Sequence, residues 1–314
     1  MDPITHAIVG LSLAVLSGEP VSLSNPALIG CVAGAMAPDI DIVMQLKGDY
    51  YYLKNHRGIS HSIPMLIFYS LIIGTALWLV FGASSPIKIM ALTFAGCLSH
   101  TLLDLTNSYG AKFLWPFYNK KIAFDLLLIY DPMLLIISSL IIFPIFKEHI
   151  PSYLVAGAFL YYLGLRLYMR AKVRKILDES YGKTYNMKYM RVLPSMIGLT
   201  KWHFIIFTDK QKIIGEINIM PRKHRVIRVL DNIDFDKQSI VMNTVLGSFF
   251  KQFTPVFHIE CDAESDKYVF NLIDLRYYIA EDFLHHATAV INKDFEVISS
   301  IFHPYRKTKN VEIM

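Results

Sequence analysis

Seven residues in the first third of the chain have side chains that can bind a divalent metal ion. They are His6, Asp39, Asp41, His56, His61, His100 and Asp104. Imidazole nitrogens and carboxylate oxygens together suit zinc, manganese or iron, whereas magnesium prefers oxygen ligands alone. The mixture therefore predicts a site for one or two divalent ions, either zinc or manganese.

The spacing of these residues favours a shared site. His100 and Asp104 are four residues apart, so one face of a helix can present both side chains. His56 and His61 flank Arg57 in a short loop, where a guanidinium beside a metal suits a phosphate oxygen or another anion. Two ions about 3.5–4 Å apart would polarise a phosphoryl oxygen and activate water.

Two of the polar residues are predicted to act in catalysis. Arg57 would stabilise negative charge on the substrate, and Asp41 would serve as a metal ligand or a general base. Simpler interpretations stay open, because an aspartate can be a solvated helix end and the helical His–Asp pair can be a helix-to-helix hydrogen bond. Asp125 and Asp131 are weaker candidates, since both also fit as caps at the start of a helix.

The segments that carry these residues have the composition of membrane helices. The chain is 54% hydrophobic and 18% charged, whereas a soluble domain carries roughly 25% charged residues. Four segments come close to the ~20 residues that cross a bilayer. They are Ser62–Phe81, Ile87–Leu105, Leu126–Phe146 and Ser152–Met169. Two earlier blocks, Ile4–Ser17 and Pro26–Ala37, are shorter and either cross fully or form a re-entrant hairpin.

Positive charges are distributed unevenly between the connections. Loops 39–61 and 106–125 and the segment after residue 169 are rich in lysine and arginine, whereas the opposite side carries only Lys88 and Lys147. The positive-inside rule places the rich side in the cytoplasm. We therefore expect a multi-pass protein with both termini and all seven metal-binding candidates on the cytoplasmic face. The opening Met1-Asp2-Pro3 resembles a helix cap more than a signal peptide.

Residues 171–314 are expected to form a small cytoplasmic α+β domain. A basic helix from Arg166 to about Ser180 leads into it, and alternating apolar residues predict hairpins at 202–219 and 289–302. The expected fold is mainly α, a polytopic bundle of about six helical segments in residues 1–170 followed by this domain.

Several classes of function lack sequence support. Cys31, Cys97 and Cys261 show no disulfide or zinc spacing. Neither a His-Glu-x-x-His helix nor a Gly-x-Ser-x-Gly elbow occurs. The His100-x-x-x-Asp104 spacing occurs in metal-free lipid phosphate phosphatases, but their Pro-Ser-Gly-His loop is missing here. The net charge of +5 is largely in membrane loops, so no nucleic-acid partner is expected.

An ordered set of motifs resembles one known family. The motifs are Asp2-Pro3-Ile4-Thr5-His6-Ala7, Ala37-Pro38-Asp39-Ile40-Asp41, His56-Arg57-Gly58-Ile59-Ser60-His61-Ser62, Leu98-Ser99-His100-Thr101-Leu102-Leu103-Asp104, Tyr109-Gly110, Leu114-Trp115-Pro116-Phe117 and Asp131-Pro132. Residues 1–170 resemble the YdjM-like inner-membrane proteins, described as LexA-regulated, membrane-bound, metal-dependent hydrolases. The resemblance implies a bacterial or archaeal cytoplasmic-membrane protein, with Arg57 and the seven metal-binding candidates at the polar motif positions.

The favoured hypothesis is hydrolysis of a phosphoester or related bond by metal-activated water. A site at headgroup level favours a membrane lipid or lipid-linked substrate. The alternative is a metal-binding sensor or regulator without catalysis, which a closed ligand shell would favour. A transporter is a third option, but it would predict polar residues on both membrane faces.

Overall fold

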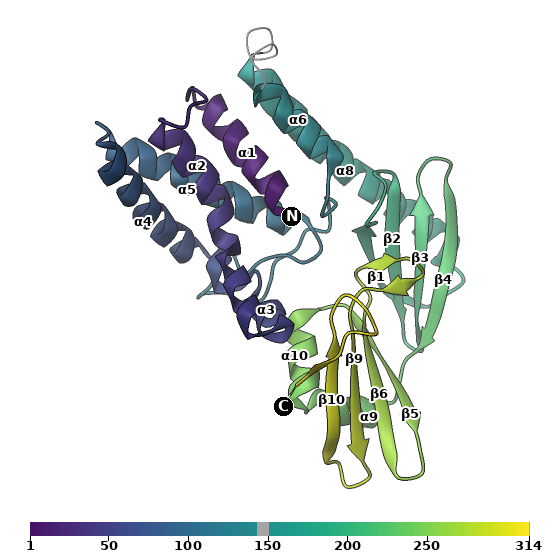
Figure 1. The fold of residues 1–314 in the computed structure, drawn as a ribbon. Coiled ribbons are helices and arrows are strands. Elements are labelled where there is room, and N and C mark those ends of the chain that lie inside the picture. Colours follow the sequence, from purple (N-terminus) through teal and green to yellow (C-terminus); the bar gives the residue numbers. More distant parts are fainter. Residues whose placement is uncertain (143–150, 314) are drawn as a thin grey trace. The chain divides into compact units, whose positions relative to one another are not determined.

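A computed structural model describes residues 1–142 and 151–313, which divide into two compact units (Figure 1). The helical unit contains residues 1–43 and, apart from 143–150, residues 55–168. The soluble unit contains residues 44–54 together with the chain from Met169 onward. A short stretch of the N-terminal half therefore belongs to the C-terminal unit.

The N-terminal half is helical throughout most of its described length. Its elements are α1 (Pro3–Leu16), α2 (Pro26–Met36), η1 (Ala37–Lys47), α3 (Asp49–Asn55), η2 (Ile59–His61), α4 (Ile63–Phe81), α5 (Pro86–Thr106), α6 (Pro132–Ile142) and α8 (Ser152–Tyr181). Asp2 caps α1 as predicted, accepting a hydrogen bond from Thr5 N at 3.0 Å, with Pro3 at the first helical position.

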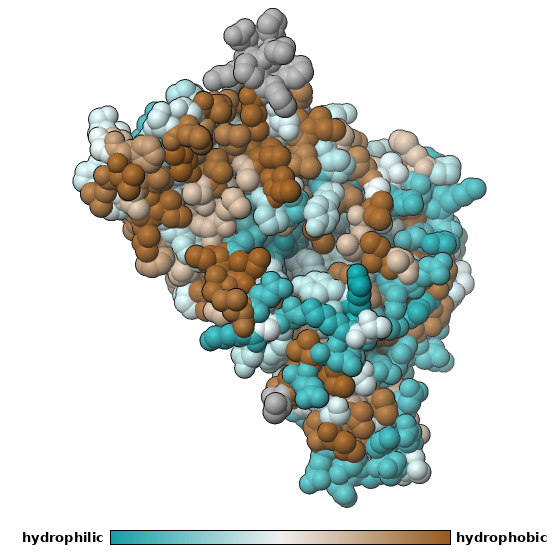
Figure 2. All heavy atoms as spheres, viewed as in Figure 1, coloured by the Kyte–Doolittle hydropathy of each residue, from teal (hydrophilic) through white to brown (hydrophobic). Residues whose placement is uncertain are grey.

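Within the described residues, three helices are long and apolar enough to cross a membrane. They are Pro26–Lys47, Ile63–Phe81 and Pro86–Thr106. The last two confirm predicted segments. The first is longer than expected, because the 3₁₀ turns of η1 continue α2 past Ala37 without a break. Figure 2 shows the apolar surface of these helices in brown.

A bundle of six spanning helices is not confirmed. The predicted segment Leu126–Phe146 becomes helical only at Pro132, and its last four residues, like Lys147, lie outside the described residues. Ser152–Met169 does form the first part of α8, but it is not among the three candidate spans, since Arg166 and several tyrosines lower its hydropathy. The α1 helix is apolar but short.

The two ends of the helical hairpins are chemically different. The helices α1 and α2 form a hairpin, as do α4 and α5, and one end of each hairpin carries the predicted ligands. At the other end, Glu19 from the first connection pairs with Lys88 of α5 at 2.6 Å. The helices α1 and α2 run in opposite directions between the two ends. The start of α1, which carries His6, therefore lies at the same end as the predicted ligands that follow α2.

The helices α2 and α5 pack closely because glycines face the neighbouring backbone. A Cβ at Gly96 would lie 2.0 Å from the Cys31 carbonyl oxygen, and one at Gly34 would lie 2.2 Å from the Thr93 carbonyl oxygen. Any larger residue would force the helices apart. This approach sets the distance between η1, which continues α2, and the last turns of α5.

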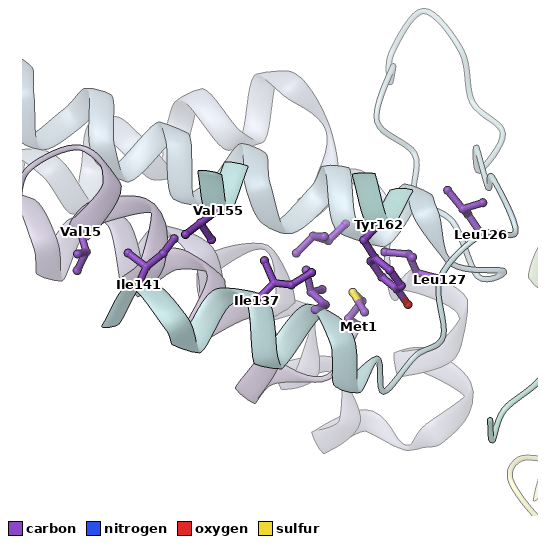
Figure 3. Close-up of a cluster of buried hydrophobic side chains, with 10 residues drawn as sticks. Met1, Val15, Leu126, Leu127, Ile137, Ile141, Val155 and Tyr162 are labelled. Atoms are coloured by element: carbon purple, nitrogen blue, oxygen red, sulfur yellow. The ribbon is translucent and has the colours of Figure 1, made fainter. Parts of the chain in front are cut away.

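A buried apolar cluster joins α1, α6 and the first part of α8. Figure 3 shows Val15, Ile137, Ile141 and Val155 packed along this seam, with Met1 and Tyr162 at one end. This packing holds the start of the chain inside the helical unit.

The soluble unit contains two antiparallel sheets. Its elements are β1 (Met187–Pro194), β2 (Lys201–Thr208), β3 (Gln211–Asn218), β4 (Lys223–Asp231), α9 (Phe235–Met242), α10 (Val245–Phe253), β5 (Phe257–Ala263), β6 (Lys267–Asp274), β7 (Tyr278–Ile279), β8 (Asp282–Phe283), β9 (His286–Asn292), β10 (Val297–His303) and β11 (Val311–Glu312). The first sheet has the order β1-β2-β3-β4, the second β11-β10-β9-β6-β5, and β7 pairs with β8. The β2–β3 and β9–β10 hairpins confirm both predicted hairpins.

The core of the soluble unit is shared by its two sheets. Leu193, Ile205 and Ile214 of the first sheet pack against Val256 and Ile273 near the second. The C-terminal half of α8, predicted as a basic helix, covers the other face of the first sheet. These contacts give the region after residue 168 an antiparallel α/β core.

The helix α3 lies in this soluble unit although it follows η1 in sequence. Tyr50 packs edge-on against Phe249 of α10, with ring centroids 4.8 Å apart, and Asp49 forms an ion pair with Lys309. Leu53 is buried. Charge and apolar contacts therefore fix this helix to the C-terminal domain.

Candidate metal centre

The predicted ligands converge on one end of the helical unit. Asp39 and Asp41 lie in the 3₁₀ turns of η1, His61 ends η2, and His100 and Asp104 lie on one face of α5 near its end. Two groups of donor atoms form there, each compact enough to hold an ion.

The first donor group consists of Asp39, His61, His100 and Asp104. The Nε2 atoms of His61 and His100 are 3.2 Å apart, and they lie 3.3 and 3.6 Å from Asp104 Oδ2. Asp39 Oδ1 is 3.5 Å from His61 Nε2 and 3.4 Å from His100 Nε2. Ligands at 2.0–2.2 Å from a tetrahedral ion are about 3.3–3.6 Å apart. The four atoms therefore have the spacing of a coordination shell.

Hydrogen bonds behind the two imidazoles fix which nitrogen faces this shell. His100 Nδ1 lies 2.7 Å from the Ala35 carbonyl oxygen, so Nδ1 must donate and a neutral ring leaves Nε2 bare. The Ser60 hydroxyl donates to Asp41 Oδ2 at 3.0 Å and so accepts from His61 Nδ1 at 2.9 Å. With both rings neutral, four lone pairs face one another.

A cation at its centre would stabilise this arrangement. Two carboxylate oxygens and two imidazole lone pairs repel one another, and burial strengthens that repulsion. Within the part of the chain that the structure describes, Asp39 Oδ1 is buried without a hydrogen-bond partner. A metal ion coordinated by all four atoms would satisfy each of them.

The second donor group consists of Asp39, Asp41 and His56. His56 Nδ1 lies 2.9 Å from Asp41 Oδ1, while Asp41 Oδ2 accepts hydrogen bonds from Arg57 N and Ser60 Oγ at 3.0 Å each. Asp39 belongs to both groups and would bridge two ions. Because this group has three donors, an ion held there would keep positions for other ligands.

The second donor group lies closer to solvent than the first. The side chains of His61, His100 and Asp104 are fully buried, whereas those of Asp39 and His56 are 22% and 17% exposed. Asp39 and His56 are therefore the donors in contact with solvent, while His61, His100 and Asp104 are enclosed.

Arg57 is held beside Asp104. Its Nε lies 2.9 Å from Asp104 Oδ2, NH1 donates to Asn107 Oδ1 at 2.8 Å, and the guanidinium lies over the Tyr109 ring at 5.3 Å. The residue is 3% exposed and adopts the left-handed region with φ 56°. This geometry favours a residue that orients Asp104, which differs from the substrate-binding role predicted from the sequence.

His6 lies next to the donor groups but belongs to neither. Its ring stacks on that of His100 at a centroid distance of 3.6 Å, and its Nε2 is 3.4 Å from Asp104 Oδ1. The Met1 α-amino group donates to the same Asp104 oxygen. The structure therefore places His6 in contact with two candidate ligands, His100 and Asp104.

The loop histidines have opposite pKa shifts. Burial lowers the pKa of His61, but the Asp104 and Asp39 carboxylates together raise it above its ordinary value. Burial lowers the pKa of His56, and its hydrogen bond to Asp41 offsets only part of that effect. The region around His61 therefore attracts positive charge.

Four other polar residues lie beside the donor groups or outside them. Ser60 and Asn107 were not predicted, although Ser60 lies inside the His-Arg-Gly-Ile-Ser-His motif and Asn107 follows Asp104 by three residues. Neither donor group contains Asp125 or Asp131. Asp131 caps α6 and accepts from the Tyr162 hydroxyl at 2.7 Å.

Comparison with known proteins identifies the family of the N-terminal part of the chain. Residues 1–173 match the YdjM inner membrane protein family. The chain belongs to this family. Its members are described as inner membrane proteins, which supports a membrane location, and the resemblance stated from the motifs is confirmed.

Two further matches include the C-terminal region. Residues 239–312 match the YfhP C-terminal alpha/beta plait domain. The uncharacterized protein YfhP of Bacillus subtilis strain 168 is 28% identical over 316 residues, which cover 96% of this chain and 94% of that protein. No solved structure matches the chain. The alignment with this relative therefore includes both regions of the chain.

Proposed function

We propose that this YdjM-family protein is a membrane-bound, metal-dependent hydrolase of a phosphoester or related bond. The observation that carries the proposal is the pair of donor groups that share Asp39, one with four donors and one with three. A pair of divalent ions in such groups supplies Lewis-acid stabilisation of phosphoryl oxygens and lowers the pKa of water. We favour zinc or manganese, because the donors mix imidazole with carboxylate.

The surrounding residues would position the reacting groups. Asp41, already held by Arg57 N and Ser60 Oγ, would orient His56 and accept a proton on the open side of the site. Arg57 and His6 would hold Asp104 and His100 in place. The reacting bond would enter beside Asp39, where the side chains are partly exposed.

A membrane lipid or lipid-linked phosphoester is the proposed substrate class. Ile40 and Ile42 alternate with the two η1 aspartates and are 55% and 54% exposed, so the chain beside the candidate ligands presents apolar side chains outward. In a membrane such a surface contacts acyl chains near the headgroups. We further propose that this end of the helices faces the cytoplasm of a bacterial cell, with no role for nucleic acid.

A metal-binding regulator is the second candidate function. The first donor group alone would complete a tetrahedral zinc shell, and closed four-ligand zinc sites are usually structural. The number of bound ions separates the two functions, since hydrolysis needs the second group occupied.

The proposed function can be tested in purified protein reconstituted in nanodiscs that contain phosphatidic acid. After loading with zinc or manganese, we expect two ions per chain by mass spectrometry and release of inorganic phosphate. The double variant His100→Ala, Asp104→Ala should lose both, whereas His224→Ala, an exposed histidine of the soluble unit, should keep both. One tightly bound ion without hydrolysis of a phosphomonoester or phosphodiester bond in any phospholipid would favour the regulator. Wild-type protein with no more metal than the double variant would contradict both functions.

A further inference from the structure

A cavity in the soluble unit lies far in sequence from the candidate metal ligands. Its volume is about 340 Å³, at the lower end of the range for small-molecule sites. The lining includes Tyr189, Phe207, Lys212, Asn232 and His258, which come from β1, β2, β3, the segment after β4, and β5. All of them belong to one compact unit, so the cavity is a feature of that fold alone.

Three of these side chains form one row across the first sheet. Tyr189 pairs with Phe207, and Phe207 pairs with Lys212, in the register of adjacent antiparallel strands. The two aromatic rings stack in parallel, with centroids 4.1 Å apart and planes 9° apart. The row thus presents a flat apolar surface that ends in an ammonium group.

The ammonium group of Lys212 lacks an anionic partner. Its Nζ donates to the Phe257 carbonyl oxygen at 2.9 Å and contacts His258 Nδ1 at 3.4 Å. No carboxylate among the described residues pairs with it. Burial lowers the pKa of Lys212 to about 8 and that of His258 to about 3, so the histidine is neutral at pH 7.

This combination suits a particular ligand. A partly buried cation is costly without a counter-charge, and an ammonium can donate three hydrogen bonds, of which two are used inside the protein. An anion bound at the Lys212 end of the row would accept the third hydrogen bond. A planar group attached to that anion would lie against the aromatic pair.

We propose that this cavity binds a small anionic molecule with a planar apolar group, whose carboxylate, sulfonate or phosphate pairs with Lys212. The soluble unit then contains a ligand-binding site separate from the metal centre. The proposal does not depend on the hydrolase activity.

Binding can be measured by calorimetry on the full-length protein in nanodiscs, with benzenesulfonate as the probe. This anion is charged throughout the usable pH range and has no hydrolysable bond. We expect saturable binding of benzenesulfonate and at least tenfold weaker binding of methyl phenyl sulfone, its neutral analogue. Equal binding of the two compounds, or no binding at millimolar concentrations, would overturn the proposal.

Variants of the protein locate the site. Lys212→Met should weaken benzenesulfonate binding about tenfold, and Lys212→Arg should retain most of it, because the charge is kept. Lys210→Met, at an exposed position in the same hairpin, is the matched control and should bind normally. The double variant His100→Ala, Asp104→Ala should also bind normally, and loss of binding in that variant would assign the anion to the metal centre instead. The comparison of the two probes on wild-type protein holds even if Lys212→Met fails to fold.

Discussion

At the scale of single residues, the strongest features are buried side chains whose partners fix their orientation. Arg57 is an example, because its guanidinium forms an ion pair with Asp104 and donates a hydrogen bond to Asn107. We expect Arg57→Met to weaken metal binding by about 10–100-fold, the usual cost of losing an orienting partner. Competition with a chelator measures this effect, and Lys120→Met, an exposed site, is the control. Unchanged metal affinity with lost hydrolysis would instead support the substrate-binding role inferred from sequence.

Lys212 gives a pH-dependent prediction at the same scale. Since burial places its pKa at about 8, Lys212 is charged below that pH and neutral above it. Benzenesulfonate binding should therefore be strong at pH 7 and fall between pH 8 and 9. The other titratable groups that line the cavity do not interfere, because His258 is neutral throughout and burial raises the pKa of Tyr189. Binding that is constant from pH 7 to 9.5 would show that Lys212 carries no part of it.

The sequence indicated which polar residues lie together better than it indicated the contacts that they make. His100 and Asp104 share a helical face as their spacing required, because that geometry is local. The positions of Ser60 and Asn107 depend on how separate loops meet, which no local pattern encodes. The same limit applies to Arg57, whose motif indicated a charge but whose left-handed backbone and contact with Asp104 arise only in the folded chain.

At the scale of elements, the approach of α2 and α5 determines how far Asp39 lies from His100. A methyl group at Gly96 would overlap the Cys31 carbonyl, so Gly96→Ala must separate the helices. We expect a loss of about 1–3 kcal/mol in stability and weaker metal binding, measured by thermal unfolding and chelator competition. Gly157→Ala on α8 is the matched control, since a Cβ there would meet nothing within 4 Å. Full metal affinity in Gly96→Ala would show that the centre tolerates a shift of the two helices.

Element boundaries were predicted well where a proline lies in the first turn of an apolar run, as in α4 and α5. They were predicted less well where tertiary packing decides. The continuation of α2 through η1 passes Pro38 and two aspartates, which normally signal a helix end. The aspartates remain in helical turns because buried hydrogen-bond donors and histidines from other segments surround them.

At the scale of the whole molecule, the orientation in the membrane follows from the separation of the two ends of the helical unit. Candidate ligands lie at one end, and the connection between α4 and α5 lies at the other. In a background with Cys261→Ala, we expect Lys120→Cys to react with a membrane-impermeant thiol reagent only from the cytoplasm, and Ser84→Cys only from outside. Reaction of both cysteines from the same side would contradict the proposed topology.

The docking of α3 has a consequence for how this protein can be divided. Residues 44–54 leave the helical unit after Val43 and return at Asn55, between the two halves of the second donor group. The family match to residues 1–173 includes α3, but Phe249 of α10, against which Tyr50 packs, lies beyond it. Dividing the chain near residue 170 therefore separates α3 from the unit to which it belongs. The N-terminal fragment keeps α3 without its packing partners, and the C-terminal fragment loses the contacts that α3 makes. The two regions are interleaved, so neither can be exchanged for a foreign counterpart without redesigning the segment they share.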